Sequence, residues 1–320
     1  MIELLAAWLN GLQFGTPLAH KGLTLVPLYS PEPGETARYQ TLAEAIAAGL
    51  VTVSEAKAAR VPTLALTNRG PLPVFILDGE ELVGGLQNRI VNTTLLVPAR
   101  STFTLPVSCV ERGRWRETRP VFEPGETAYP RLRRGKFDHV TASYALRGQP
   151  IADQGEVWAD IAERQHRLGA RSATNAMRDS YVAREAEVRN AQEQLRCPED
   201  GPVGVAALVG GKALCADIFD HSATLKAYWN RLVRSYALEA LEAQPAEPSP
   251  DAVRQLLQRA LTAEHLVFAS PGLGHDVRLN GNDLVGAALI WDDVVVHTAL
   301  FAREGESSLP QRLRGRWHAR

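Results

Sequence analysis

Acidic, amide and guanidinium side chains gather between apolar runs in one stretch of the chain, residues 74–115. Carboxylates accept hydrogen bonds from sugar hydroxyls, and the planar donor fork of arginine fits phosphate. The combination predicts a polar cleft that binds or processes a small phosphorylated sugar or nucleotide. With two residues from further along the chain, the predicted ligand-binding residues are Asp78, Gln87, Asn88, Arg89, Cys109, Glu111, Arg114, Trp115, Asp153 and Gln154.

Glu80 and Glu81 are the predicted catalytic residues. Either would bind hydroxyls or act as a general base, but side chains alternate along a strand, so only one of them can face the other polar groups. In this hypothesis Arg89 and Arg114 hold phosphate, and Trp115 stacks on a ring. The residue types do not define a reaction, so the sequence leaves open whether the protein is an enzyme.

Cysteine and metal chemistry are less favoured by the pattern. Cys109 has no histidine near it in sequence, the closest being His20 and His139, so a buried core thiol is a better interpretation than a nucleophile. The eight histidines are scattered, and no H-x-H, H-E-x-x-H or C-x-x-C occurs. We therefore predict no metal site, and the cofactor stays unknown.

A rival hypothesis is a non-enzymatic module. In it the same polar residues are buried to set strand register, and the helices present a face to a protein partner. Exposure separates the two hypotheses: an open cleft lined by Glu80, Asn88 and Arg89 favours ligand binding, and internal pairing of these side chains favours the module. A nucleic-acid contact by the basic run at 131–136 is less favoured, because few aromatic residues accompany it.

The elements that must position these residues are mainly strands. Asp78-Gly79 favours a two-residue turn, which predicts a tight hairpin between residues 74–77 and a strand that starts at Leu82. Further strands at 90–97 and 102–110 would complete an antiparallel meander. Turn signals about every ten residues predict an antiparallel β-sandwich or barrel-like sheet.

Helices are predicted elsewhere, so the expected class is α+β with a segregated group of helices. Capping signals open helices at Thr41, Asp153 and Ser249, while residues 174–195 and 221–243 have helical composition or spacing. Gly210-Gly211 predicts a hairpin between 203–209 and 212–219. Periodicity fails over residues 116–150, which are predicted to be a connection or flap.

These elements predict four parts of the chain. Residues 1–22 form an N-terminal helix and linker, and residues 23–243 the main α+β domain, with a meander (23–115), a loop (116–150), and helices and a hairpin (151–243). Residues 244–303 add a helix and strands that pack on this domain, and residues 304–320 form a basic tail that could be disordered. The sequence leaves open whether the C-terminal strands join the main sheet.

Composition argues against several classes of partner. With 35 Lys and Arg against 36 Asp and Glu, the net charge of -1 makes no field that attracts nucleic acid or an anionic membrane. The apolar run at the N-terminus carries Glu3 and is shorter than the roughly 20 residues that span a bilayer. Three scattered cysteines fit a reducing compartment. We expect a cytoplasmic protein of unknown oligomeric state.

Several ordered blocks resemble one known family. They are LDGEELVGGLQNRIVNTTLLVPA, LPVSCVERGRW, DQGEVWADIAERQHRLGARSATNAM, and VGVAALVGGKALCADIFD with WNRLVRSYALEAL after it. Over residues 23–243 the chain resembles the ARG and Rhodanese-Phosphatase-superfamily-associated protein domain family. The resemblance implies a link to ADP-ribose or NAD-derived nucleotides through the proteins with which the family associates.

The resemblance also marks residues beyond the predicted site. Leu86 stands where the family pattern has Lys, which removes one basic group. The further family-like residues are Gly79, Asn92, Ser108, Trp158 and Asp220.

Overall fold

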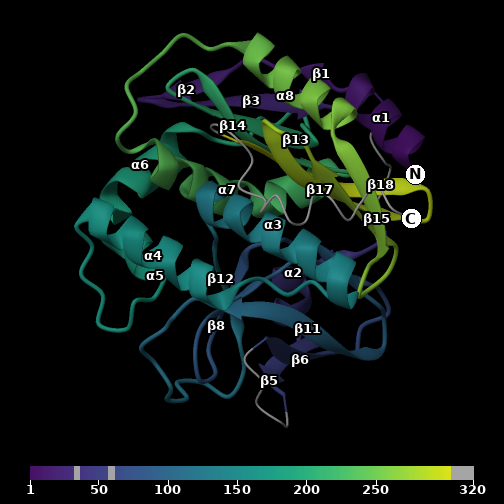
Figure 1. The fold of residues 1–320 in the computed structure, drawn as a ribbon, viewed down its shortest axis with the longest axis vertical. Coiled ribbons are helices and arrows are strands. Elements are labelled where there is room, and N and C mark those ends of the chain that lie inside the picture. The colour runs from purple at the N-terminus through teal and green to yellow at the C-terminus, as the bar shows by residue number, and fades with distance from the viewer. Residues whose placement is uncertain (32–36, 57–61, 304–320) are drawn as a thin grey trace.

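The computed structural model describes residues 1–31, 37–56 and 62–303 of the 320-residue chain. The α+β class is confirmed, because helices surround largely antiparallel sheets (Figure 1). The predicted basic tail at 304–320 lies outside the described residues. The helices are α1 (Ile2–Gly11), α2 (Leu42–Ala47), α3 (Pro130–Arg147), α4 (Gln154–Leu168), α5 (Arg178–Val182), α6 (Glu185–Gln194), α7 (Ser222–Ala240) and α8 (Pro250–Thr262).

A nine-stranded sheet joins the two ends of the described chain. Its order is β1-β3-β13-β14-β18-β17-β16-β15, with β2 also paired to β3. The strands that follow α8 therefore extend the same sheet as β3, which answers the question that the sequence left open. The strands are β1 (Gln13–Phe14), β2 (Leu18–His20), β3 (Leu23–Tyr29), β13 (Gly204–Val209), β14 (Lys212–Phe219), β15 (Glu264–Ala269), β16 (His275–Asn280), β17 (Leu284–Trp291) and β18 (Val294–Ala302).

Helices cover both faces of this sheet. Leu5 and Leu9 of α1 and Val253 of α8 share one apolar core with the sheet. On the opposite face, Trp229 and Tyr236 of α7 belong to a second core. The sheet is therefore the middle layer of this part of the molecule (Figure 1).

Two smaller sheets pack together as a sandwich. Their orders are β10-β7-β4 and β12-β8-β9-β11-β6-β5. Val74 and Ile76 of the first sheet share a core with Leu66 and Leu105 of the second. The strands are β4 (Gln40–Thr41), β5 (Val51–Glu55), β6 (Thr63–Asn68), β7 (Val74–Ile76), β8 (Glu80–Val83), β9 (Arg89–Val91), β10 (Leu95–Val97), β11 (Ser101–Cys109) and β12 (Glu123–Thr127).

The hairpin predicted at Asp78-Gly79 is wrong, although the turn is present. Gly79 has a φ of 77°, and the N–H of Glu80 donates to the carbonyl of Leu77 (3.1 Å). However, β7 pairs with β10 and β4, whereas β8 pairs with β9 and β12. The reason is burial on both faces: Ile76 points into the sandwich core and Phe75 into the core against α7, so β7 is an inner strand.

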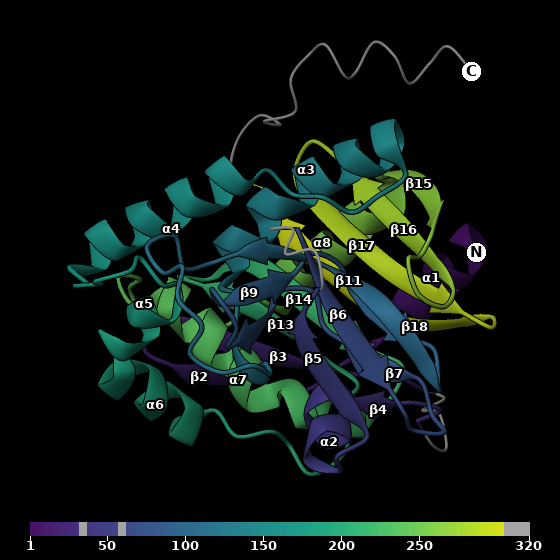
Figure 2. The same cartoon turned by 90° about the horizontal axis from the view of Figure 1, so that it is seen from below.

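The loop predicted for residues 116–150 is also wrong over much of its length, because β12 occupies Glu123–Thr127 and α3 begins at Pro130. Proline suits the first helical position. The helical pattern is not evident in the sequence because the buried face of α3 carries Arg133 and Lys136 beside apolar residues such as Phe137. A charged buried face hides the apolar stripe on which periodicity arguments depend. Figure 2 shows α3 and α4 side by side.

Several predictions of helix caps and turns are confirmed. Thr41 and Glu44 form the predicted capping box, and Asp153 and Ser249 cap α4 and α8. The β13–β14 hairpin turns at Gly210-Gly211 as expected. The helix predicted over 174–195 is instead two helices, α5 and α6, separated near Arg184, whose φ and ψ are -125° and 26°.

Candidate functional site

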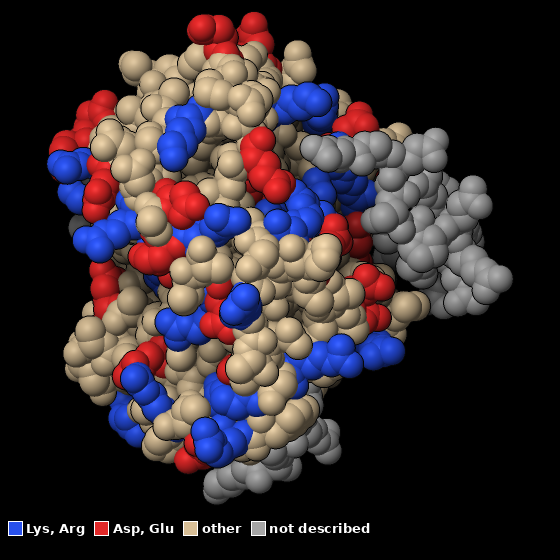
Figure 3. Space-filling model, turned by 90° about the vertical axis from the view of Figure 1, so that its left-hand side faces the viewer, with Lys and Arg blue, Asp and Glu red and all other residues tan. Residues whose placement is uncertain are grey.

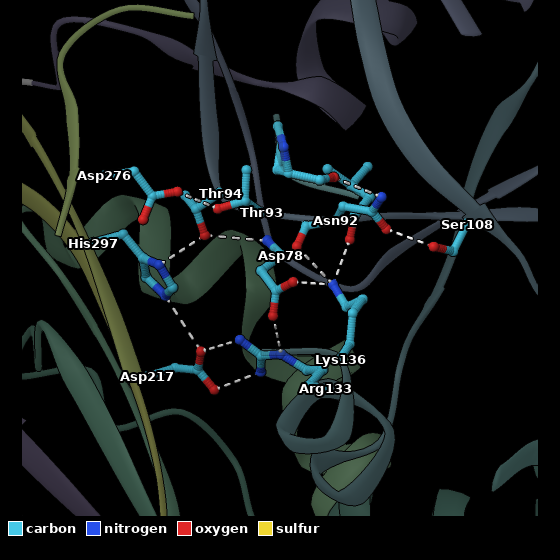
Figure 4. A network of polar contacts seen from close by, with 12 residues as sticks. Asp78, Asn92, Thr93, Thr94, Ser108, Arg133, Lys136, Asp217, Asp276 and His297 are labelled. Atoms are coloured by element: carbon cyan, nitrogen blue, oxygen red, sulfur yellow. Dashed lines mark hydrogen bonds and ion pairs between the residues drawn. The ribbon is translucent and has the colours of Figure 1, made fainter. Parts of the chain in front are cut away.

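An ion-pair network lies in the interior, between α3 and the sheets (Figure 4). The guanidinium of Arg133 donates to both carboxylate oxygens of Asp217 in β14 (2.7 and 2.8 Å) and to Asp78 (3.1 Å). Tyr236 of α7 donates to the same Asp217 carboxylate (2.5 Å). All four side chains are buried. Burial alone would raise the pKa of Asp217, but the Arg133 guanidinium holds that pKa well below its usual range.

Lys136 extends the network one helical turn further along α3. Its ammonium contacts the Asp78 carboxylate and donates to the carbonyls of Val91 (2.8 Å) and Asn92 (3.0 Å). Burial lowers the pKa of Lys136 to about 8, although Asp78 opposes this shift. Asp78, a predicted ligand-binding residue, therefore has two internal cationic partners.

His297 of β18 contacts the network at Asp217. Its Nε2 lies 3.3 Å from Asp217, and its Nδ1 lies 3.0 Å from the Thr94 hydroxyl. Burial lowers the pKa of this imidazole, although Asp217 opposes the shift. Sequence reasoning missed His297 and Asp217, because they lie far along the chain from Asp78.

Glu80 is buried and has partners on α7. Tyr228 donates to Oε2 (2.8 Å) and Arg231 donates to Oε1 (2.7 Å). The backbone N–H of Leu77 also donates to Oε2 (3.2 Å). This carboxylate attaches the long helix to the turn between the two smaller sheets.

Glu81 points to different surroundings, as the alternation of strand side chains requires. Its Oε2 accepts from the backbone N–H of Glu126 (3.1 Å), while Oε1 has no hydrogen-bond partner. Burial raises the pKa of Glu81 to about 7, although Arg178 opposes the shift. A Cβ added to Gly125 would stand 2.4 Å from Oε2, so β12 lies directly against this carboxyl.

A second group of predicted residues forms hydrogen bonds beside the end of β11. Glu111 accepts from the backbone N–H of Asn88 (3.1 Å) and from Arg114 (2.7 Å), and Arg114 donates to the Asn88 side chain (2.9 Å). Gln87 donates to the Glu111 carbonyl and accepts from Arg89 (both 3.0 Å). These contacts connect the β8–β9 turn with the residues that follow β11.

The remaining predicted residues lie in different surroundings. Cys109 is buried, which raises the pKa of its thiol, and its backbone exchanges two 2.8 Å hydrogen bonds with the Gln154 side chain. Asp153 caps α4, and Trp115 is 60% exposed. The structure therefore brings most of the predicted residues into two separate groups of buried contacts, with Asp153 and Trp115 exposed.

A surface hollow of about 550 Å³ lies elsewhere, between α1, the start of β18 and the N-terminus of α7. Its walls combine apolar groups with a few polar ones, and the residues that matter here are Ala7, Trp8, Arg38, Asp220, His221 and Val294. A volume of this size is within the range of sites for small ligands, roughly 300–1,000 Å³.

The polar groups of this hollow come from distant parts of the chain. Burial raises the pKa of the Asp220 carboxyl to about 6, although a hydrogen bond from Tyr39 opposes the shift. Arg38 lies over the ring of Trp291 (4.7 Å) and pairs with Asp292 (2.6 Å). The indole N–H of Trp8 is buried and has no hydrogen-bond partner.

Sequence reasoning marked Asp220 only as a family-like residue and missed Trp8, Arg38 and His221 in this role. One signal was present: Asp220-His221 is a polar pair between a strand and a long helix. Among the described residues, no group of three or more His, Cys, Asp or Glu side chains is arranged to hold a metal ion.

The fold and site define an α+β protein whose sheets are joined by buried ion pairs and which has a surface hollow of about 550 Å³ beside Asp220. The chain belongs to the ARG and Rhodanese-Phosphatase-superfamily-associated Protein domain family, which it matches over residues 11–301. The match confirms the resemblance and extends it through the C-terminal strands. No curated protein and no solved structure matches the chain. In the described part of the chain, no helix has the length and apolar character needed to cross a membrane.

Proposed function

We propose that the protein binds a small ribose-phosphate ligand of the ADP-ribose or NAD-derived class in the hollow beside Asp220. The observation that carries the proposal is the presence of three side-chain types in one 550 Å³ hollow: the carboxylate of Asp220, the guanidinium of Arg38 and the indole of Trp8. The sequence predicts the same combination of groups at other residues.

Each group matches one part of such a ligand. Asp220 accepts hydrogen bonds from vicinal ribose hydroxyls, and Trp8 offers an aromatic surface to a base. Arg38 binds phosphate in place of Asp292. The Arg38–Asp292 pair has side chains 46% and 65% exposed, so exchanging it for phosphate costs little.

The buried motif, which comprises Asp78, Glu80, Arg133 and Asp217, then has a positioning role. Glu80 binds Tyr228 and Arg231 of α7, the helix that begins immediately after Asp220 and His221. The Asp78–Arg133–Asp217 contacts hold the preceding strand, β14. In this proposal the motif sets the walls of the hollow and does not touch the ligand.

Calorimetric titration with ADP-ribose tests the proposal. Asp220→Asn and Arg38→Gln each remove one charged contact, so we expect each to weaken binding by about tenfold or more. Trp8→Phe, which keeps most of the packing of α1, should weaken it less. In a parallel thermal-shift assay, ligand at about 100 times its Kd stabilises the wild type by about 2.7 kcal/mol.

Matched surface variants serve as controls. Arg119 is exposed and paired with Glu123, as Arg38 is with Asp292, and Trp115 is an exposed indole outside the hollow. Arg119→Gln and Trp115→Phe should bind ADP-ribose as the wild type does. Weaker binding by Trp115→Phe with normal binding by Asp220→Asn would place the ligand at the originally predicted residues instead.

The non-enzymatic module remains a second candidate, and one observation favours it. Glu80, Asn88 and Arg89 are 0–3% exposed, and each makes hydrogen bonds inside the protein. If neither ADP-ribose, NAD, nucleotides nor sugar phosphates stabilise or titrate the wild-type protein, this candidate replaces ligand binding.

A further inference from the structure

The basic run at the start of α3 divides between two faces of the helix. Arg133 and Lys136 point into the interior network, whereas Arg131 and Arg134 line a surface hollow. Residues three apart share a helical face, which explains this division. The inward pair is neutralised by Asp78 and Asp217, but the outward pair requires a separate explanation.

The hollow has a volume of about 210 Å³ and lies between α3, the β13–β14 turn and the end of β18. Its charged lining residues are Arg131, Arg134, Arg167, Lys212 and Glu239. Lys212 begins β14, whereas Asp220 follows the end of that strand. The basic hollow and the hollow of the proposed ligand are therefore at opposite ends of β14.

Two of the charged residues that line this hollow already have ion-pair partners. Arg131 pairs with Asp160 (3.1 Å) and Glu163 (2.6 Å). Glu239, the acidic residue of the lining, accepts from the backbone N–H of Arg131 (2.8 Å) and pairs with Arg164. The charge of Glu239 is therefore already paired with that of Arg164.

Other cations of the hollow lack a carboxylate partner. Arg134 donates to the carbonyl of Ala302 (2.9 Å), and within the described ranges neither Arg134 nor Lys212 pairs with an acidic side chain. Arg167, by contrast, pairs with Glu242 (2.9 Å). Figure 3 shows basic and acidic side chains intermingled over one face of the molecule, a pattern in which opposite charges are close together. The unmatched positive charge of this hollow departs from that pattern.

We propose that the hollow between Arg134 and Lys212 is a second binding site, which takes a small phosphoryl dianion. Arginine supplies a directional donor fork and lysine a compact positive charge, the pair of groups that phosphate oxygens favour. The shared chemistry is that of inorganic phosphate or a phosphate monoester. Because the hollow is small, the phosphoryl group occupies it and any remainder of an ester extends into solvent.

Calorimetric titration at pH 7.5 and constant ionic strength tests this site with inorganic phosphate and glycerol 3-phosphate. Arg134→Gln and Lys212→Gln should each weaken phosphate binding by about tenfold or more. The controls are Arg119→Gln and Lys226→Gln, since both residues are exposed and lie outside the hollow. These controls should bind as the wild type does. Tighter binding of the ester than of inorganic phosphate identifies a phosphorylated metabolite as the ligand, and the reverse identifies free phosphate.

Two results would overturn the proposal. One is binding of phosphate no stronger than that of chloride, which would show only a general preference for anions. The other is wild-type affinity in both Arg134→Gln and Lys212→Gln. Asp220→Asn should leave phosphate binding unchanged, so failure of this site and failure of the proposed ADP-ribose site can be told apart.

Discussion

Arg133 of α3 binds Asp217 of the nine-stranded sheet through two parallel hydrogen bonds of 2.7 and 2.8 Å. The same guanidinium also reaches Asp78, at the turn between the two smaller sheets. One fully buried side chain therefore joins the nine-stranded sheet to the turn between the two smaller sheets. Such contacts are directional, so they define how the sheets are placed against each other more narrowly than apolar packing does.

Replacing Arg133 should destabilise the protein strongly. Arg133→Met leaves Asp217 buried without its main cationic partner, so we expect the free energy of unfolding to fall by about 3–5 kcal/mol. Urea denaturation measures the change. Arg134→Met is the matched control on the same helix and should change stability by no more than about 0.5 kcal/mol. Equal effects of the two variants would contradict the structural role of the network.

Glu80 and Arg231 should be energetically coupled. The Glu80 carboxylate is fully buried and the Arg231 side chain is 17% exposed, so their ion pair is little screened by water. A double-mutant cycle with alanine at both positions should give a coupling free energy of about 1–3 kcal/mol. The exposed pair Arg189–Glu193 on α6 is the comparison and should give less than about 0.5 kcal/mol. Coupling at Glu80 as small as that would mean that this contact does not hold α7 in place.

Stability should depend on pH through Glu81. Its pKa rises from the ordinary 4.5 to about 7 on folding, so the folded protein keeps a proton that the unfolded chain loses. The contribution to stability is therefore complete below pH 4.5 and is lost as pH rises to 7, by at most about 3 kcal/mol.

Glu81→Gln isolates this effect, because the amide does not titrate. Urea unfolding should show that the variant gains stability relative to the wild type between pH 4.5 and pH 7.5. If the amide itself changes the free energy of unfolding, it does so by the same amount at pH 4.5 and at pH 7.5. Parallel stability curves for the two proteins over this range would contradict the raised pKa.

Binding of ADP-ribose should weaken in acid through Asp220. The raised pKa of about 6 means that the carboxylate is mostly ionised at pH 7.5, whereas about one tenth is ionised at pH 5. We therefore expect Kd to rise by about tenfold between these values in calorimetric titrations. Asp220→Asn should bind more weakly and with little dependence on pH. A wild-type affinity that is constant over this range would exclude Asp220 as a direct ligand contact.

The predicted site residues show what a local sequence pattern does not determine. Glu80 and Arg89 were identified as unusual polar residues, and each has a defined environment in the folded protein. Their partners could not be predicted, because Glu80 forms an ion pair with Arg231, 151 residues away. Carboxylate and guanidinium groups in strands have the same appearance in sequence whether they face a ligand or each other.

The sequence by itself determined the local features: the capping box at Thr41 and Glu44, the caps at Asp153 and Ser249, the turn at Gly210-Gly211 and the family. These depend on contacts within a few residues or on blocks of residue identity. Only the tertiary structure decided that β7 pairs with strands outside the expected hairpin and that Arg133 of α3 points into the interior. It also decided that Trp8, Arg38 and Asp220 line one hollow. Those outcomes depend on contacts between segments far apart in the chain, which local pattern does not encode.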